Sequence, residues 1–242
     1  MKIEFWSDIV CPYCGLMDNR LRLALERFEH ADDVRVTHRS FQLHPDLPRA
    51  GITQRKLLET HGISAADGEG IFAPIEAAAR AEGLDPYRAL ERTLGPTDLA
   101  HELLAHAADK GRGEETWTAM FRAHFGEGRR LWTEDEVLGF AAETGLDRAD
   151  AARALRERRY RDRVAADQRE AERLGAGGTP FTVLDGRYAL RGAVSTDELL
   201  AAMTTVWEAT HPEPAPLRVL GEGEGEGVCG PDGCAVLPHP LS

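Results

Sequence analysis

Two cysteines near the start of the chain are the side chains whose type and spacing best suit chemistry. Cys11 and Cys14 flank a Pro-Tyr pair, and the motif stands between an apolar run at residues 3–6 and a helical pattern at residues 16–28. Paired thiols at this spacing exchange electrons with substrates by forming and breaking a disulfide. A strand that runs into a helix is the setting of a redox-active CxxC. The motif therefore predicts a redox dithiol.

The expected start of the helix gives the two cysteines different roles. Pro12 suits the first helical position, where no N–H is needed, and this places Cys11 at or next to the N-cap. The helix dipole and the unpaired amides stabilise a thiolate there and lower the pKa of a CxxC cysteine from near 8.5 to roughly 3.5–7.5. We expect Cys11 to attack the substrate and Cys14, one turn later, to resolve the mixed disulfide.

The other two cysteines, Cys229 and Cys234, stand near the C-terminal end of the sequence. The Gly-Pro-Asp-Gly sequence between them favours a tight turn, which can bring the flanking Cα atoms within disulfide range. Residues 211–228, ahead of this turn, are too poor in apolar residues to form a core and predict a flexible tether. We expect a secondary redox pair that exchanges with the first. An inert surface disulfide or a pair of idle thiols is the alternative.

The four cysteines also allow a structural zinc site, in which the distal pair completes the CxxC. Zinc knuckles are usually loops or hairpins, whereas this CxxC follows a strand and opens a Pro-started helix, so we expect no metal. His101 and His106 resemble a zinc-binding helix pair, but they are five positions apart. Their side chains then point about 140° away from each other on a helix, so they cannot chelate one ion and are expected to be ordinary helix residues.

Composition excludes several classes of partner. The 242 residues include 41 acidic and 29 basic side chains, for a net charge of −12. We therefore expect no nucleic acid and no anionic membrane surface as a partner. No apolar run approaches the length of a membrane span, and the CxxC begins too early for a signal peptide to precede it. These features predict a cytoplasmic protein, in a compartment where paired cysteines are seldom structural disulfides.

The order of strands and helices indicates an α/β fold with a helical insertion. A strand at residues 3–6, a helix at 16–28 and a strand at 34–41 predict a parallel pair with a right-handed crossover. This unit places the CxxC at the C-terminal edge of the first strand, where α/β sheets usually carry their chemistry. Glycines and prolines then separate a series of helical segments with no convincing strand. These segments span residues 53–61, 65–82, 97–110, 114–125, 134–144 and about 149–174.

Strand character returns at residues 179–184 and 187–190, on either side of Asp185-Gly186. This dipeptide between such runs is a strong hairpin signal, because a type I′ turn needs positive φ at both central positions. The hairpin completes the sheet.

A final helix at residues 196–208 follows Ser195, with Glu198 at a capping-box spacing. With it, the chain divides into four predicted parts. Residues 1–50 and 175–210 form the two halves of the sheet domain, residues 51–174 form the insertion, and residues 211–242 form the tail.

Ser7-Asp-Ile-Val-Cys-Pro-Tyr-Cys14, the long helical insert and Gly178-Thr-Pro-Phe181 resemble the DsbA-like thioredoxin-fold oxidoreductases, in particular their FrnE-type branch. The resemblance extends from residue 1 to about 210. It implies a thioredoxin fold, a central mixed sheet flanked by helices, interrupted by an all-helical domain. It also implies that the Thr179–Pro180 bond is cis and lies against the CxxC. Pro12 and Tyr13 would support the site between the cysteines, although many members have Trp in place of Tyr13.

The resemblance and the motif together predict a thiol-disulfide oxidoreductase or isomerase without a cofactor. Its partners would be proteins with thiols or disulfides, and glutathione or a thioredoxin-like reductant could exchange electrons with it. The direction of exchange stays open. The Pro-Tyr pair between the cysteines resembles that of glutaredoxins, whose potentials are about −200 to −230 mV, and a cytosolic poise then favours the dithiol.

Two other functions compete with this prediction. Glutathione transferases of the kappa class and hydroxychromene-carboxylate isomerases share the helical insertion, but they typically rely on a single serine at the first motif position. A resolving thiol at Cys14 would compete with their chemistry. A zinc-binding module that uses all four cysteines is the third hypothesis.

Asp167 is expected to point inward, because it falls on the apolar face of the last helical segment before the hairpin. A buried acid near the dithiol could accept a proton from Cys14 during exchange. A structural, hydrogen-bonded aspartate is the alternative, and the one that we favour.

Overall fold

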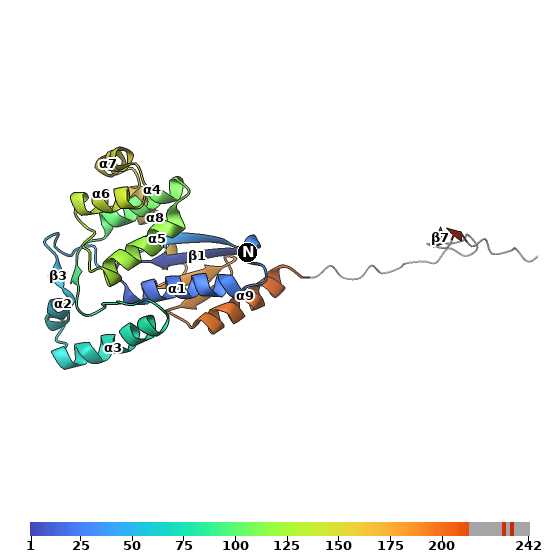
Figure 1. Cartoon of the computed structure of the whole chain (residues 1–242), viewed down its shortest axis with the longest axis horizontal. Helices are drawn as coiled ribbons and strands as arrows, with labels where there is room; N and C mark the ends of the chain where they lie inside the picture. Colours follow the sequence, from blue (N-terminus) through green and yellow to red (C-terminus); the bar gives the residue numbers. More distant parts are fainter. Residues whose placement is uncertain (213–228, 231–232, 235–242) are drawn as a thin grey trace, which may run out of the picture. The chain divides into compact units, whose positions relative to one another are not determined.

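The computed structural model describes residues 1–212, 229–230 and 233–234, and a four-stranded sheet lies at its centre (Figure 1). The strands run in the order β2-β1-β5-β6. β1 pairs in parallel with β2 and antiparallel with β5, which pairs antiparallel with β6. This mixed sheet confirms the predicted fold class. The strands are β1 (Lys2–Ser7), β2 (Arg35–Ser40), β5 (Phe181–Leu184) and β6 (Tyr188–Arg191).

Helices cover both faces of the sheet, because side chains of β1 alternate between them. Ile3 and Phe5 are buried against α1 (Pro12–Arg27) and α9 (Thr196–Thr210), which lie side by side (Figure 1). On the other face lies Trp6, whose indole N–H donates a hydrogen bond to the backbone carbonyl of Asp167 at 2.8 Å. Asp167 belongs to α8 (Arg161–Arg173), which packs against β2.

The C-terminal hairpin and helix follow the sequence signals closely. Asp185 and Gly186 have φ values of 48° and 66°, and the amide of Arg187 donates to the carbonyl of Leu184 at 3.1 Å across the turn. Both positive φ values confirm the predicted turn. At the start of α9, the amides and side chains of Ser195 and Glu198 bond reciprocally, which confirms the capping box.

The insertion contains six helices besides α8, and two of its features correct the sequence analysis. The predicted helix at 149–174 is two helices, because the backbone turns at Arg158, where φ is 51°. Two short strands, β3 (Ile52–Thr53) and β4 (Thr93–Leu94), pair antiparallel where no strand was expected. The helices are α2 (Gln54–Thr60), α3 (Ala65–Ala81), α4 (Asp98–Asp109), α5 (Gly113–Phe121) followed by a π-helical turn (Arg122–Gly126), α6 (Glu134–Glu143) and α7 (Arg148–Arg156). A 3₁₀ turn, Ala31–Asp33, precedes β2.

Residues Met1–Thr210 form one compact unit. Its largest core joins the loop after β1 to the helical insertion, since Ile9 and Val10 are buried together with Leu103 and Phe125. The division of this unit at residues 51 and 174 stays a prediction. Among the described residues, no helix has the length and apolar character needed to cross a membrane.

The second unit, His211–Ser242, is described only in part. β7 (Cys229–Gly230) and β8 (Gly233–Cys234) pair antiparallel, with Cys229 opposite Cys234. This backbone pairing agrees with the predicted turn. Residues 213–228 of the predicted tether at 211–228, and the side chains of both cysteines, lie outside the described residues.

Candidate active site

Cys11 occupies the N-cap of α1, as the sequence predicted. Its φ and ψ are −84° and 114°, and Pro12 is the first helical residue. The amide of Cys11 donates to the carbonyl of Asp8 at 3.1 Å, and the amide of Cys14 donates to the carbonyl of Cys11 at 3.0 Å. The positive end of the helix therefore lies at the Cys11 side chain, where it favours a thiolate.

The two cysteines are free thiols that interact with each other, and both are buried. A hydrogen bond from the Cys14 side chain lowers the pKa of Cys11 below its ordinary value and outweighs the opposing effect of burial. Burial raises the pKa of Cys14 well above its ordinary value, and the neighbouring Cys11 sulfur adds to this shift. The site thus favours a thiolate on Cys11 and a thiol on Cys14.

The segment before β5 lies against the first cysteine. Cys11 Sγ is 3.6 Å from the carbonyl oxygen of Thr179, within hydrogen-bond reach of the protonated thiol. The Thr179–Pro180 peptide is cis, as the resemblance implies. Tyr13 is 45% exposed, so the aromatic ring between the cysteines is available to a substrate.

Asp8 is a functional candidate that the sequence analysis quoted only as part of a motif. Its fully buried carboxylate accepts hydrogen bonds from the amides of Leu43 at 2.7 Å and Val10 at 3.4 Å, and lies 3.4 Å from His101 Nε2. Burial alone would raise the pKa of Asp8, but the contact with His101 and the two amides lower it. Asp8 therefore stays charged and fixes the loop that carries Cys11. A charged residue inside an apolar run next to the motif was the signal for it.

The helical insertion also contacts the first turn of α1 directly. Tyr87 donates a hydrogen bond from its hydroxyl to the carbonyl oxygen of Pro12. This approach depends on Gly15, because a Cβ there would lie only 2.6 Å from the Tyr87 hydroxyl oxygen. The Tyr87 ring stacks on Phe125, with 4.7 Å between the centroids. No pattern in the sequence marked Tyr87, which lies outside every expected helix.

Asp167 is buried, as its position on an apolar face predicted. Its Oδ1 is 3.0 Å from Nη1 of Arg39, and its Oδ2 accepts a hydrogen bond from the amide of Ser40 at 3.1 Å. Both carboxylate oxygens therefore fasten α8 to β2. This is the structural alternative favoured from the sequence.

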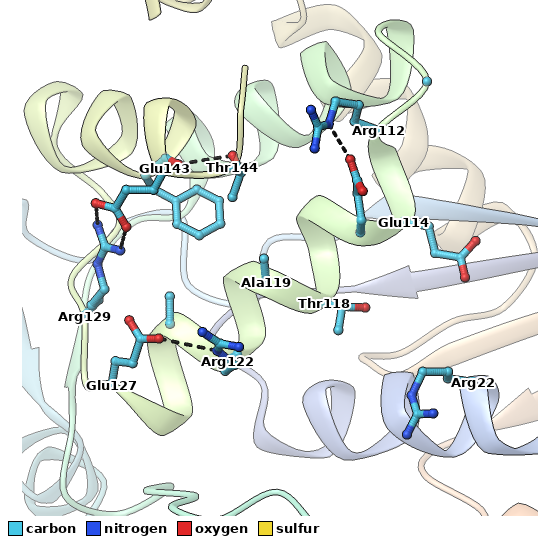
Figure 2. Close-up of a pocket in the computed structure, with 14 residues that line it drawn as sticks. Arg22, Arg112, Glu114, Thr118, Ala119, Arg122, Glu127, Arg129, Glu143 and Thr144 are labelled. Atoms are coloured by element: carbon cyan, nitrogen blue, oxygen red, sulfur yellow. Dashed lines mark hydrogen bonds and ion pairs between the residues drawn. The ribbon is translucent and has the colours of Figure 1, made fainter. Parts of the chain in front are cut away.

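Two hollows of different character lie near α1. A groove of about 710 Å³ lies between α5 and α6 (Figure 2), where Arg129 pairs with Glu143 and Arg122 pairs with Glu127. The described residues that line it do not include the two cysteines or Pro180, so this groove is separate from the thiol pair.

The second hollow, of about 440 Å³, borders α1 from Gly15 onward. The rings of Tyr87, Phe121 and Phe125 line it. This pocket places apolar surface within one residue of Cys14.

No three His, Cys, Asp or Glu side chains converge on a metal-binding position among the described residues. The four-cysteine zinc hypothesis involves the Cys229 and Cys234 side chains, which lie outside that part of the chain.

Comparisons with known proteins agree with this fold. The family model for the DSBA-like thioredoxin domain matches residues 2–204. The chain is 36% identical to a probable DsbA oxidoreductase from Streptomyces coelicolor, with a TM-score of 0.81 over 98% of this chain and 100% of that one.

Two more distant structures share the fold. The cytosolic disulfide reductase DsbM from Pseudomonas aeruginosa, solved alone and with glutathione, is 23% identical, with a TM-score of 0.55 over 87% of this chain and 96% of that one. A 2-hydroxychromene-2-carboxylate isomerase is 15% identical, with a TM-score of 0.69 over 89% of this chain and 100% of that one. At these identities the likeness shows the fold alone.

Proposed function

Because the chain belongs to the DSBA-like thioredoxin domain family, we propose that it is a thiol-disulfide oxidoreductase in which Cys11 attacks and Cys14 resolves. The observation that carries the proposal is the placement of Cys11 at the N-cap of α1, beside the Cys14 thiol and 3.6 Å from the Thr179 carbonyl. The lowered pKa of Cys11 and the raised pKa of Cys14 support these roles.

In the reducing direction the exchange takes place in two steps. The Cys11 thiolate attacks one sulfur of a substrate disulfide, and the other substrate sulfur leaves as a thiolate. Cys14 then gives its proton to solvent and attacks Cys11 Sγ, which forms the Cys11–Cys14 disulfide and releases the second substrate sulfur as a thiolate. Two electrons pass from the dithiol to the substrate. The reverse sequence oxidises a substrate dithiol, and partial reversal isomerises a disulfide.

The surroundings of the thiols favour a polypeptide substrate. The backbone of Thr179 lies beside Cys11, where an extended segment can pair with it, and the exposed Tyr13 ring offers a stacking surface. The 440 Å³ pocket at Gly15 can take an apolar side chain of the same substrate.

The same proposal includes a branch of the family, a cellular location and a reductant. Residues 7–14 and 178–181 support the FrnE-type branch. The proposed location is the cytoplasm, where paired cysteines are more often catalytic or redox-sensing than structural disulfides. Glutathione or a thioredoxin-like protein would then restore the dithiol.

The second candidate is a glutathione-dependent transferase or isomerase, which the fold shared with 2-hydroxychromene-2-carboxylate isomerase keeps in consideration. The buried Cys14 beside Cys11 argues against it, because a resolving thiol would displace glutathione from the first cysteine. An isomerase or conjugation activity that survives in Cys14→Ser protein would favour this candidate.

An insulin-reduction assay tests the proposal. Cys11→Ser should abolish turnover, and Cys14→Ser should accumulate a mixed disulfide through Cys11. The Cys229→Ser, Cys234→Ser variant keeps the Cys11–Cys14 pair, so it should still reduce insulin. Metal analysis of protein purified under reducing conditions tests the zinc hypothesis in parallel. Full activity in Cys11→Ser protein would overturn the proposal.

A further inference from the structure

Arg92 is a buried cation that forms no ion pair with a carboxylate among the described residues. It is only 8% exposed, and its Nη2 donates a hydrogen bond to the Gln54 side-chain oxygen at 3.0 Å. Its Nε and Nη1 find no hydrogen-bond acceptor in the described part of the chain. A buried charge without an opposite charge is costly, so a nearby anion is expected to offset it.

The guanidinium of Arg92 packs on an aromatic ring that contacts the first turn of α1, the helix that carries the thiols. Arg92 Cζ is 4.8 Å from the centroid of the Phe125 ring. Phe125 touches the first turn of α1, since a Cβ at Gly15 would lie 3.2 Å from it, and it stacks on Tyr87. Cys11, Tyr87 and Phe125 belong to one buried cluster. Cys11 and the Phe125 ring beside Arg92 therefore lie in the same buried cluster, where interactions between charges are screened less than in water.

Short elements of the insertion hold Arg92 in place. It directly precedes β4, which pairs with β3. The amide of Gln54, at the start of α2, donates to the Arg92 carbonyl at 3.0 Å. The amide of Gln54 thus holds the backbone of Arg92, and the side chain of Gln54 holds the guanidinium, so the charge has a defined position.

Of the acidic groups that interact with Arg92, only the thiol changes charge with redox state. Burial lowers the pKa of Arg92 to about 10, which leaves it charged at neutral pH. Asp8 is already matched by His101, and Glu76 accepts hydrogen bonds from the amides of Ala89 and Leu90. The acidic groups that raise the pKa of Arg92 are, in order, Tyr87, Cys11, Asp8 and Glu76.

The other titratable neighbours are neutral at physiological pH. Burial raises the pKa of Tyr87 well above its ordinary value, so its hydroxyl keeps the proton. Burial, with Arg92 as the next cause, lowers the pKa of His124 to about 3. Burial also lowers the pKa of His44, against the charge of Asp8. A thiolate on Cys11 is thus the anion that Arg92 gains when the disulfide is reduced.

We propose that Arg92 is the buried counter-charge of the Cys11 thiolate and stabilises the reduced form of the pair relative to its disulfide. Two electrons and one proton convert the disulfide into a Cys11 thiolate and a Cys14 thiol, so reduction creates one negative charge on Cys11. Asp8 acts in the opposite sense, because its charge raises the pKa of Cys11. Arg92 is therefore a tuning residue that acts through Cys11, and its role rests on the proposed function.

Arg92→Met removes the charge and keeps much of the side-chain volume. The pH midpoint of the Cys11 thiolate, followed by ultraviolet absorbance, should rise by up to about one unit, since ~1–3 units is the effect of an opposite charge in direct contact. The equilibrium with glutathione should shift up to tenfold toward the disulfide, which corresponds to about 30 mV. Arg92→Lys keeps the charge and should stay closer to the unmodified protein. Arg129→Met, in the groove between α5 and α6, is the control for loss of an arginine elsewhere.

Gln54→Glu is a second route that leaves Arg92 in place. A carboxylate at the position that now accepts from Nη2 would pair with the guanidinium and should raise the Cys11 midpoint in the same direction. An unchanged midpoint in folded Arg92→Met, or in Gln54→Glu if the former does not fold, would overturn the proposal. Equal shifts in Arg92→Lys and Arg92→Met would also overturn it. Absence of exchange with glutathione in the unmodified protein would instead refute the proposed function.

Discussion

The two thiols of the CxxC differ in the pKa shifts that their surroundings produce, and this difference sets their reactivity. Because the pKa of Cys11 is lowered and that of Cys14 is raised, Cys11 keeps its thiolate as the pH falls while Cys14 stays protonated. We expect Cys11 to be alkylated faster at about pH 6. Mass-spectrometric mapping of the modified residue checks this. Faster modification of Cys14 would reverse the assigned roles.

Gly15 gives a second test at the residue scale. Gly to Ala in a helix ordinarily stabilises by roughly 0.5–1 kcal/mol, but the new Cβ would lie 2.6 Å from the Tyr87 hydroxyl oxygen. We expect the clash to outweigh the propensity, so Gly15→Ala should lower the free energy of unfolding by about 1–3 kcal/mol. Urea denaturation measures it.

A double-mutant cycle identifies the cause. Tyr87→Phe removes the oxygen that the Cβ would meet, so Gly15→Ala should cost less in that background than in the unmodified chain. Equal costs in both backgrounds would show that Tyr87 does not set the requirement for glycine.

Local sequence was sufficient to predict some site residues and insufficient for others. The N-cap position of Cys11 follows from Pro12 beside it, because both lie in one turn of chain. The contact between Asp8 and His101 joins the loop after β1 to α4, and only tertiary packing creates it. Arg92 likewise has no local pattern that marks it as buried.

Among the elements, helices bounded by glycine or proline were predicted well, and unmarked boundaries were missed. The chain breaks between α7 and α8 at Arg158, where an arginine adopts positive φ without a glycine to signal it. β3 and β4 are two residues long, so they have no alternation to detect. These two strands nevertheless position Gln54 and Arg92.

The π-helical turn after α5 buries His124 and makes the stability of the fold pH-dependent. Burial lowers its pKa from 6.5 to about 3. The unfolded chain therefore binds more protons between these values, and the free energy of unfolding falls as the pH falls through this window. We expect a loss of about 1.4 kcal/mol per pH unit from this group. His124→Gln should flatten the pH dependence measured by urea denaturation, and a slope identical to that of the unmodified protein would contradict this.

At the scale of the whole molecule, the tail pair stays a prediction from the sequence. The predicted tether of residues 211–228 has an expected span of roughly 25 Å and an effective concentration in about the millimolar range. We expect the Cys229→Ser, Cys234→Ser variant to re-reduce its oxidised Cys11–Cys14 pair more slowly than the full protein. Stopped-flow measurement of that rate checks it. Equal rates, with no disulfide between Cys11 and the tail in Cys14→Ser protein, would leave the tail without a catalytic role.

The fold class was predictable because the strand, helix and hairpin signals are local and agree with one another. The core that joins the insertion to the loop after β1 and to α1 was not predictable, since residues such as Phe125 and Gly15 meet only in the folded unit. It is through this core that the insertion reaches the thiols.

The central claim is that Cys11 and Cys14 form one two-electron redox couple. Equilibrium titration of the protein against glutathione buffers, with the disulfide mapped by mass spectrometry, tests it most directly. We predict a single transition in which both thiols convert together to a Cys11–Cys14 disulfide, and its loss in Cys11→Ser protein. Two thiols that stay reduced across the whole range, or that form only separate glutathione adducts, would contradict the account.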